Sequence, residues 1–147
     1  MVGIVDADSA EHETLSKNLI IAPVVCPVPD RRNGAPKLSG PCRLRIQPGC
    51  RLAAIYGANE IEEEYFCNFE VNRDYIQEFS RAGMRLSAFG EDGELRAVEL
   101  PDHAFFIATL FQPQLSSTEK TPHPLVLAFV QAAADWGKKK LDDSVLE

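Results

Sequence analysis

The sequence predicts an α/β fold, and three segments carry this prediction. Residues Phe105 to Phe111 form an unbroken run of apolar and β-branched side chains, typical of a strand buried on both faces in the middle of a covered sheet. Residues 72–81 have helical spacing, and residues 85–100 have the pattern of a β-hairpin. Open α/β sheets place functional side chains just past the C-terminal ends of central strands. Here Gln112 and Gln114 occupy those positions, and an amide cannot exchange a proton near neutral pH.

Length and composition limit the classes of function. The chain has 147 residues, of which 45% are hydrophobic and 25% are charged, as in one ordinary globular domain. Its net charge of −7 argues against a nucleic-acid partner, because affinity for phosphates comes from Lys and Arg. No apolar run approaches the roughly 20 residues of a membrane span, and the N-terminus lacks the form of a signal peptide. We therefore expect a cytoplasmic protein with no membrane partner and no cofactor.

The cysteines predict free thiols. They lie far apart in the sequence without a Cys-x-x-Cys pair, which favours unpaired thiols in a reducing compartment. A zinc site that combines them with His12 or His103 is a less favoured alternative, because metal ligands usually come in closely spaced pairs. A reactive thiol is a second alternative, although no neighbouring charge marks one as acidified. The four residues are Cys26, Cys42, Cys50 and Cys67.

The N-terminal part alternates between loops and strands. Residues 1–18 are polar and acidic and predict a surface loop with a solvated His12, followed by a strand at 19–25 that lies at an edge or ends at Pro23. Proline and glycine crowd residues 27–41 and predict a loop or an exposed hairpin tip. The alternating segment 42–46 predicts a half-buried strand, which turns back into a second strand at 52–56.

The middle of the chain predicts a strand and a helix. The acidic segment 58–64 predicts at most a short helical turn, with Glu62-Glu63-Glu64 as a solvated face. Residues 65–71 are strand-like. Asn72 then caps a helix through Arg81, which the left-handed Gly83 stops.

The C-terminal part predicts a hairpin and a buried helix. Strands at Arg85–Phe89 and 95–100 are joined by an Asp-Gly turn. Prolines open a helix at residues 122–124, and Gly137 ends it before a tail at 138–147. Five apolar side chains indicate that this helix is buried, namely Leu125, Leu127, Ala128, Phe129 and Ala132.

Several short motifs resemble one known family. They span about Arg51 to Ala133 and are Phe69-Glu-Val-Asn72, Ala82-Gly83, Glu91-Asp-Gly93, Val98-Glu-Leu-Pro-Asp-His103, Phe105-Phe-Ile107, Phe111-Gln-Pro-Gln114 and Pro122-His-Pro-Leu125. In this order they resemble the C-terminal half of the class I glutamine amidotransferase domain of CTP synthase, and in particular small proteins related to that region. The resemblance implies part of a flavodoxin-like doubly wound sheet, with residues 1–147 as a single partial domain whose N-terminal elbow half is missing.

The resemblance also implies that the catalytic groups have been lost. Active members use a cysteine on a strand-to-helix elbow to attack the glutamine carboxamide, while a histidine oriented by a glutamate moves the protons. Gln112 and Gln114 stand at the histidine and glutamate positions, and losing a general base alone removes a factor of about 10²–10⁴. No Gly-x-Cys-x-Gly elbow occurs in the sequence. Asn68 replaces an arginine that helps to bind glutamine, so only Asn68 and Phe69 remain as candidate substrate-binding positions. At the family's Leu-Pro-Asp-His turn His103 is not catalytic, and we interpret His123 as a helix-start residue.

Three hypotheses follow from this reading. The first is a degenerate, inactive glutamine amidotransferase-like domain related to the pyrimidine-nucleotide enzyme CTP synthase. The second is one part of a longer or split amidotransferase or hydrolase, whose nucleophile lies upstream or on another chain. The third, weaker hypothesis is a small-molecule sensor that keeps the old pocket without turnover. Since a missing half leaves a strand edge and a sheet face uncovered, self-association or a partner chain that covers them is expected.

Overall fold

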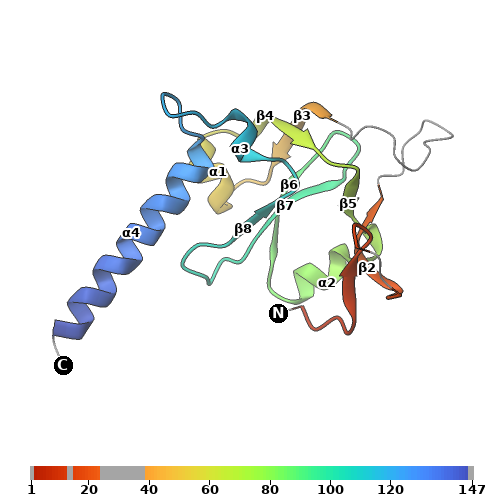
Figure 1. Cartoon of the computed structure of the whole chain (residues 1–147), viewed down its shortest axis with the longest axis horizontal. Helices are drawn as coiled ribbons and strands as arrows, with labels where there is room; N and C mark the ends of the chain where they lie inside the picture. Colours follow the sequence, from red (N-terminus) through yellow and green to blue (C-terminus); the bar gives the residue numbers. More distant parts are fainter. Residues whose placement is uncertain (1, 13–14, 24–38, 146–147) are drawn as a thin grey trace.

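The computed structural model describes residues 2–12, 15–23 and 39–145, which form two β-sheets and several helices (Figure 1). The larger sheet has the strand order β4-β3-β6-β7-β8, and every neighbouring pair in it is antiparallel. Its strands are β3 (Ser39–Ile46), β4 (Glu60–Phe66), β6 (Arg85–Phe89), β7 (Leu95–Glu99) and β8 (Ile107–Thr109). None of the helices in the described chain is both long and apolar enough to span a membrane.

The smaller sheet has the order β1-β2-β5, with β1 (Ala7–Ser9) parallel to β2 (Asn18–Pro23) and β2 antiparallel to β5 (Phe69–Val71). The strand predicted at 19–25 is described as far as Pro23, and its last two residues, like most of the loop predicted at 27–41, lie outside the described residues. The prediction of a continuous loop over residues 1–18 was wrong at β1, because pairing with β2 makes that short polar segment extended. The strand-like segment 65–71 is divided at Cys67 and Asn68, where the chain passes from the larger sheet to the smaller one.

Helix α1 (Arg51–Tyr56) replaces the strand predicted at 52–56. Its first turn is held by Cys50, whose Sγ accepts a hydrogen bond from the Ala53 N–H at 3.3 Å. The buried Glu99 carboxylate accepts from the N–H groups of Arg51 and Leu52, at 2.9 and 3.2 Å. Both contacts satisfy donors that a helix start leaves unpaired. The strand prediction failed because Glu99, one of the two caps, lies 47 residues or more along the sequence from the N–H groups that it caps.

The predictions for residues 72–99 are confirmed. Asn72 caps a single 3₁₀ turn at Arg73–Tyr75 by accepting from the Asp74 N–H at 3.1 Å, and helix α2 (Ile76–Arg81) follows directly. Gly83 has φ 82°, the left-handed conformation that ends a helix. Strands β6 and β7 pair as the predicted hairpin.

Two further predictions are corrected, one for the acidic segment 58–64 and one for the apolar run 105–111. The acidic segment forms strand β4 rather than a helical turn, and Glu63 within it is buried rather than solvated, with 6% of its surface exposed. The apolar run at 105–111 contributes β8, which lies at an edge of the larger sheet among the described strands. Ala108 at its centre is exposed, so β8 is not covered on both faces by the described chain.

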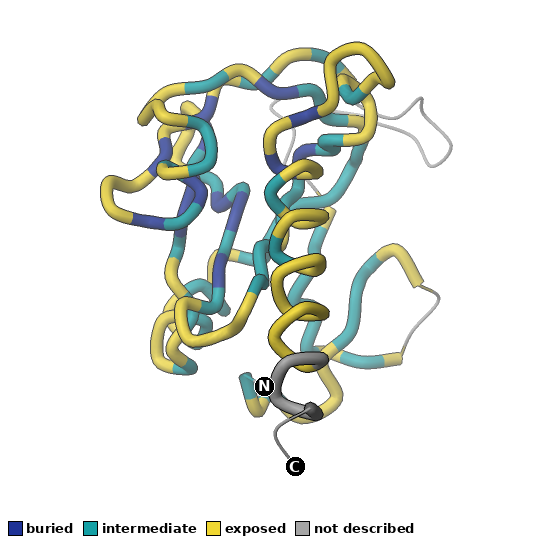
Figure 2. Tube along the Cα trace, turned by 90° about the vertical axis from the view of Figure 1, so that its left-hand side faces the viewer, coloured by how far each residue is buried: buried dark blue, intermediate teal, exposed yellow. Residues whose placement is uncertain are grey.

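Helix α4 (Pro124–Val145) is longer and more exposed than predicted. It runs through Gly137, so residues 138–145 are helical rather than a tail. A single glycine in a helix costs only about 1 kcal/mol relative to alanine, and good helix formers flank this one. Leu125 is buried, but Leu127 and Phe129 are 52% and 56% exposed. Figure 2 shows α4 exposed along most of its length, and Figure 1 shows that only its first turns meet the rest of the fold.

The main core lies where the larger sheet meets α1 and the start of α4. Its buried members are Leu44, Ile46, Cys50, Leu52, Ala88, Ala97, Phe111 and Leu125. The half-buried strand predicted at 42–46 is confirmed, since Leu44 and Ile46 point into this core while Arg43 and Arg45 are exposed.

Candidate functional site

The Phe-Gln-Pro-Gln motif forms the connection between β8 and α3 (Pro113–Ser116), a helical turn. Phe111 anchors the motif, because its side chain is only 1% exposed within the core. Its carbonyl accepts a hydrogen bond from the Thr109 hydroxyl at 2.9 Å, which fixes the bend directly after the strand. The motif therefore lies past the C-terminal end of an apolar strand.

Gln112 is bound to strand β4 by both its main chain and its side chain. Its N–H donates to the Glu64 carbonyl at 2.9 Å, and its Nε2 donates to the Phe66 carbonyl at 3.3 Å. An amide nitrogen can only donate in such a contact. The side chain thus connects the β8–α3 loop to the end of β4, a structural task that requires no titration.

Gln114 lies in a different environment. It is the second residue of α3, and its side chain is exposed. Gln112 is instead partly buried against β4. The two amides therefore do not share one buried site. Gln114 is exposed while Gln112 is held against β4, so Gln114 is not placed to orient a side chain at position 112.

Asn68 and Phe69 lie close in sequence to the carbonyl that Gln112 binds. Both are partly buried, Asn68 at the passage between the sheets and Phe69 opposite Pro23 in β5. The structure therefore brings Gln112 to Phe66, two residues before Asn68. Gln112, Asn68 and Phe69 remain candidate positions of one strand-end site, from which the Gln114 side chain is separate.

The sequence did not predict a buried polar cluster that includes Glu63, the residue before Glu64, whose carbonyl Gln112 contacts. It consists of Tyr56, Glu63 and His123, which come from α1, β4 and the residue before α4. Glu63 Oε1 accepts from the Tyr56 hydroxyl at 2.5 Å and lies 2.9 Å from His123 Nε2. Glu63 and His123 are 6% and 5% exposed. A buried carboxylate is tolerated when it is paired and hydrogen-bonded in this way.

The main chain fixes the tautomer of His123. The Leu125 N–H donates to His123 Nδ1 at 3.1 Å, so Nδ1 carries a lone pair and Nε2 carries the proton. Nε2–H then donates to Glu63, while the Ser117 hydroxyl accepts from the His123 N–H at 3.0 Å. His123 is thus a helix-start residue, as interpreted from the sequence, and also the group that holds α4 against β4. No local motif could have indicated this, because Glu63 lies 60 residues away.

The Tyr56 phenol predicts a pH dependence of stability. Burial, followed by the hydrogen bond to Glu63, raises the pKa of Tyr56 well above its ordinary value of 10.0. A raised pKa stabilises the fold below the unfolded pKa, and this contribution is lost as the pH rises through and above about 10. We expect the free energy of unfolding to fall more steeply with alkaline pH in the natural chain than in Tyr56→Phe. Urea titrations followed by far-UV circular dichroism at several alkaline pH values measure both slopes, and equal slopes would contradict the assignment.

The described cysteines are free thiols, as predicted. Cys50 is 2% exposed and caps α1. Burial raises the pKa of the Cys42 thiol, which keeps it protonated and unreactive. Cys67 is partly buried between β4 and β5, and Cys26 lies outside the described residues. Within the described ranges, no three His, Cys, Asp or Glu side chains are grouped as metal ligands.

The remaining histidines lie on the surface. His103 is exposed in the turn between β7 and β8, and its Nδ1 accepts from the Phe105 N–H at 3.2 Å. His12 is exposed, with its Nδ1 3.1 Å from Asp8 Oδ1. Both positions agree with the expectation of a turn residue and a surface residue.

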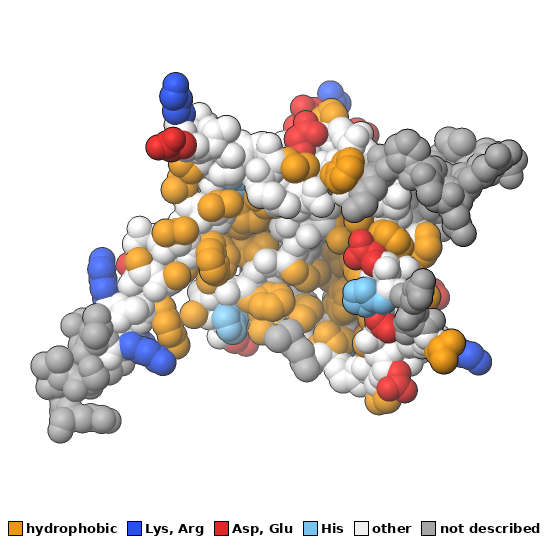
Figure 3. All heavy atoms as spheres, in the orientation of Figure 1, with side chains coloured by type: hydrophobic (Ala, Val, Ile, Leu, Met, Phe, Trp, Pro, Cys, Tyr) orange, Lys and Arg blue, Asp and Glu red, His pale blue; other side chains and the backbone are white. Residues whose placement is uncertain are grey.

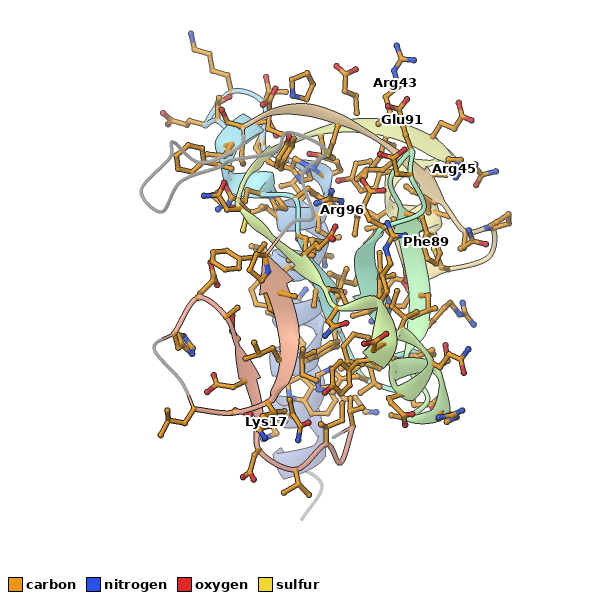
Figure 4. All side chains as sticks on the ribbon, turned by 90° about the vertical axis from the view of Figure 1, so that its right-hand side faces the viewer. Lys17, Arg43, Arg45, Phe89, Glu91 and Arg96 are labelled. Carbon is orange, nitrogen blue, oxygen red and sulfur yellow. The ribbon has the colours of Figure 1, made fainter. Side chains whose placement is uncertain are left out.

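A charged groove of about 540 Å³ lies on the outer face of β3 and β4. Arg43 is opposite Glu62 and Arg45 is opposite Glu60 in the strand register. Figure 4 shows Arg43 and Arg45 pointing outward from the sheet, with Glu91 near Arg43. The groove therefore carries alternating charges of both signs, which is a pattern of cross-strand pairing rather than a site for one kind of ion.

Comparisons with known proteins point to one group of relatives. A CTP synthase of Cytophaga hutchinsonii is 34% identical over 146 residues, which is 95% of this chain and 26% of the relative. A CTP synthase of Gluconobacter oxydans is 39% identical over 116 residues, 75% of this chain and 21% of the relative. No protein-family model matches the chain.

The structural comparison agrees with the sequence comparison. The glutaminase domain of Trypanosoma brucei CTPS, solved with bound acivicin, superposes with a TM-score of 0.80 and 32% sequence identity. The match covers 91% of this chain and 53% of that chain. The predicted α/β fold of the flavodoxin-like type is thereby confirmed. The chain spans about a quarter of the length of the first curated relatives and about half of the solved one.

Proposed function

Because this chain is a homologue of the C-terminal half of the class I glutamine amidotransferase domain of CTP synthase, we propose that it is an amidotransferase-like binding or structural module that does not hydrolyse glutamine on its own. The contact of Gln112 with the Phe66 carbonyl carries this proposal. At the position where the family has its histidine, the chain holds a group that donates to main-chain oxygen and cannot accept a proton from a thiol.

Two further observations support the proposal. The exposed Gln114 cannot complete a dyad with Gln112, because the two side chains face different surroundings. Neither Cys42 nor Cys50 replaces the family nucleophile, since the first has a raised pKa and the second is buried as a helix cap. A base and an acidified thiol are both needed to form the thioester.

Ammonia release from glutamine tests the proposal directly. We expect the purified chain to give the rate of a protein-free control, while the Gluconobacter oxydans relative provides the matched family comparison. The double variant Gln112→His/Gln114→Glu restores the residues of the family pattern. We expect it to remain inactive alone, because these changes add no nucleophile. Turnover by the natural chain clearly above the protein-free rate would refute the proposal.

A second candidate function is one part of a longer or split amidotransferase. The coverage supports it, since nearly all of this chain matches only half of a solved glutaminase domain. In this case the nucleophile comes from elsewhere, and the present chain contributes the framework of one side of the site. Its test is whether the chain purifies from its own cells with a second polypeptide or as part of a larger one.

A further inference from the structure

Helix α4 has the composition of a buried helix but not the surroundings of one. Between Pro124 and Trp136 the only polar side chains are Gln131 and Asp135, which are hydrogen-bonded to each other at 2.9 Å. A helix that is apolar around most of its circumference is normally covered on most sides. The described chain buries only Leu125 in this stretch and leaves a set of large side chains exposed, namely Val126, Leu127, Phe129, Val130 and Trp136.

An apolar groove of about 760 Å³ runs between α4 and the loop that leads into β8. Phe105 lines this groove, with its ring 5.7 Å from the Phe129 ring and 5.7 Å from the Arg51 guanidinium carbon. Trp136 of α4 also lines it. Figure 3 shows hydrophobic side chains gathered in this region between the helix and the sheet. Large continuous apolar patches of this kind mark interaction sites.

Strand β8 leaves an edge next to the same groove. Among the described strands it pairs with β7 alone, through the register Ala97↔Thr109 to Glu99↔Ile107. Its sequence is that of a central strand, with no charge or proline inside the run 105–111 to block further pairing. Phe105, two residues before β8, and Phe129 of α4 line the same groove, so the edge strand begins beside the exposed side of the helix, and no other described element covers either of them.

We propose that this surface, defined as the β8 edge together with the exposed apolar sides of α4, docks the upstream half of a glutamine amidotransferase-like domain. The inference rests on the second candidate function and names its contact surface. The solved glutaminase domain contains almost as much chain again as the part matched here. One half-domain whose sheet continues from β8 would pair the edge and cover α4 at once. A second copy of this chain would instead place another exposed α4 against this surface, and the cross-linking experiment distinguishes that arrangement.

Site-specific photo-cross-linking in the protein's own cells tests the surface. A photoreactive phenylalanine analogue replaces Val130, which is 57% exposed on α4, and in a matched control replaces the exposed Arg81 on α2. We expect the Val130 position alone to give cross-links to a polypeptide segment whose sequence matches the part of the solved glutaminase domain that this chain does not cover. This segment lies either on a separate chain or upstream in the same chain, and protein mass distinguishes the two sources.

Substitutions on the surface complete the test. We expect the cross-link from position 130 to be lost in Leu127→Glu/Phe129→Glu, whose circular dichroism should stay native because both side chains are already half exposed. Cross-links only between two copies of this chain, or a monomer without cross-links, would overturn the inference. Glutamine turnover by the purified chain combined with the expected cross-link would reject the inactive module but not this surface. Absence of both turnover and cross-link would reject the surface alone.

Discussion

Replacing His123 by alanine is expected to lower the free energy of unfolding by about 3–5 kcal/mol, the range for leaving a buried charged group without one of its partners. The substitution removes the Nε2 donor that lies 2.9 Å from Glu63 and leaves a carboxylate that is 6% exposed with Tyr56 as its remaining cluster partner. It also removes the Nδ1 acceptor of the Leu125 N–H at the start of α4. The loss of stability thus has two causes: the buried Glu63 carboxylate keeps fewer hydrogen bonds, and the contact between the start of α4 and β4 is weaker.

Two matched variants separate these causes. Glu63→Gln keeps the shape and one acceptor oxygen while it removes the charge, and we expect it to cost about 1–2 kcal/mol. Glu62→Gln changes the exposed neighbour on the same strand, and we expect a change of at most about 0.5 kcal/mol. Urea unfolding followed by far-UV circular dichroism measures all three. A loss below about 1 kcal/mol in His123→Ala would show that the cluster does not hold the helix start.

Replacing Phe111 by alanine is expected to cost about 3–5 kcal/mol, as for other fully buried phenylalanines. Phe111 is 1% exposed and packs in the same core as Leu44 and Leu52. The cavity lies directly before Gln112, so we also expect the loop to lose its fixed position against Glu64 and Phe66. Hydrogen exchange at the Gln112 N–H should therefore become faster than unfolding alone explains.

The control for this prediction is a phenylalanine of strand β4, whose main chain Gln112 contacts. Phe66 is 45% exposed, and the main-chain carbonyl through which it accepts from Gln112 Nε2 is kept in an alanine variant. We expect Phe66→Ala to cost less than about 1 kcal/mol and to leave exchange at residue 112 unchanged. Equal losses in the two alanine variants would show that Phe111 does not anchor the motif.

Elements fixed by neighbouring residues could be predicted from the sequence. The Asp-Gly turn predicts the β6–β7 hairpin, and the Asn72 cap with the left-handed Gly83 predicts the ends of α2. Each of these signals acts over a few residues, so the rest of the fold cannot override it easily.

Elements decided by distant partners could not be predicted in this way. Glu63 lies within an acidic run that resembles a solvated face, and its burial depends on hydrogen bonds from His123 and Tyr56. Helix α1 depends on Glu99 for its first turn. Of the candidate site, the identities of Gln112 and Gln114 could be read directly. Their separate surroundings could not, since these depend on where β4 passes the loop.

The position of Trp136 has a consequence for spectroscopy. It is the only tryptophan in the chain, and it sits about half exposed on the part of α4 that extends away from the core. Its emission therefore reports the ordering of that helix rather than the melting of the packed interior. Fluorescence and ellipticity can then give transitions at different denaturant concentrations in this chain, and such a difference would show that the outer part of α4 melts separately from the core, so that unfolding is not two-state.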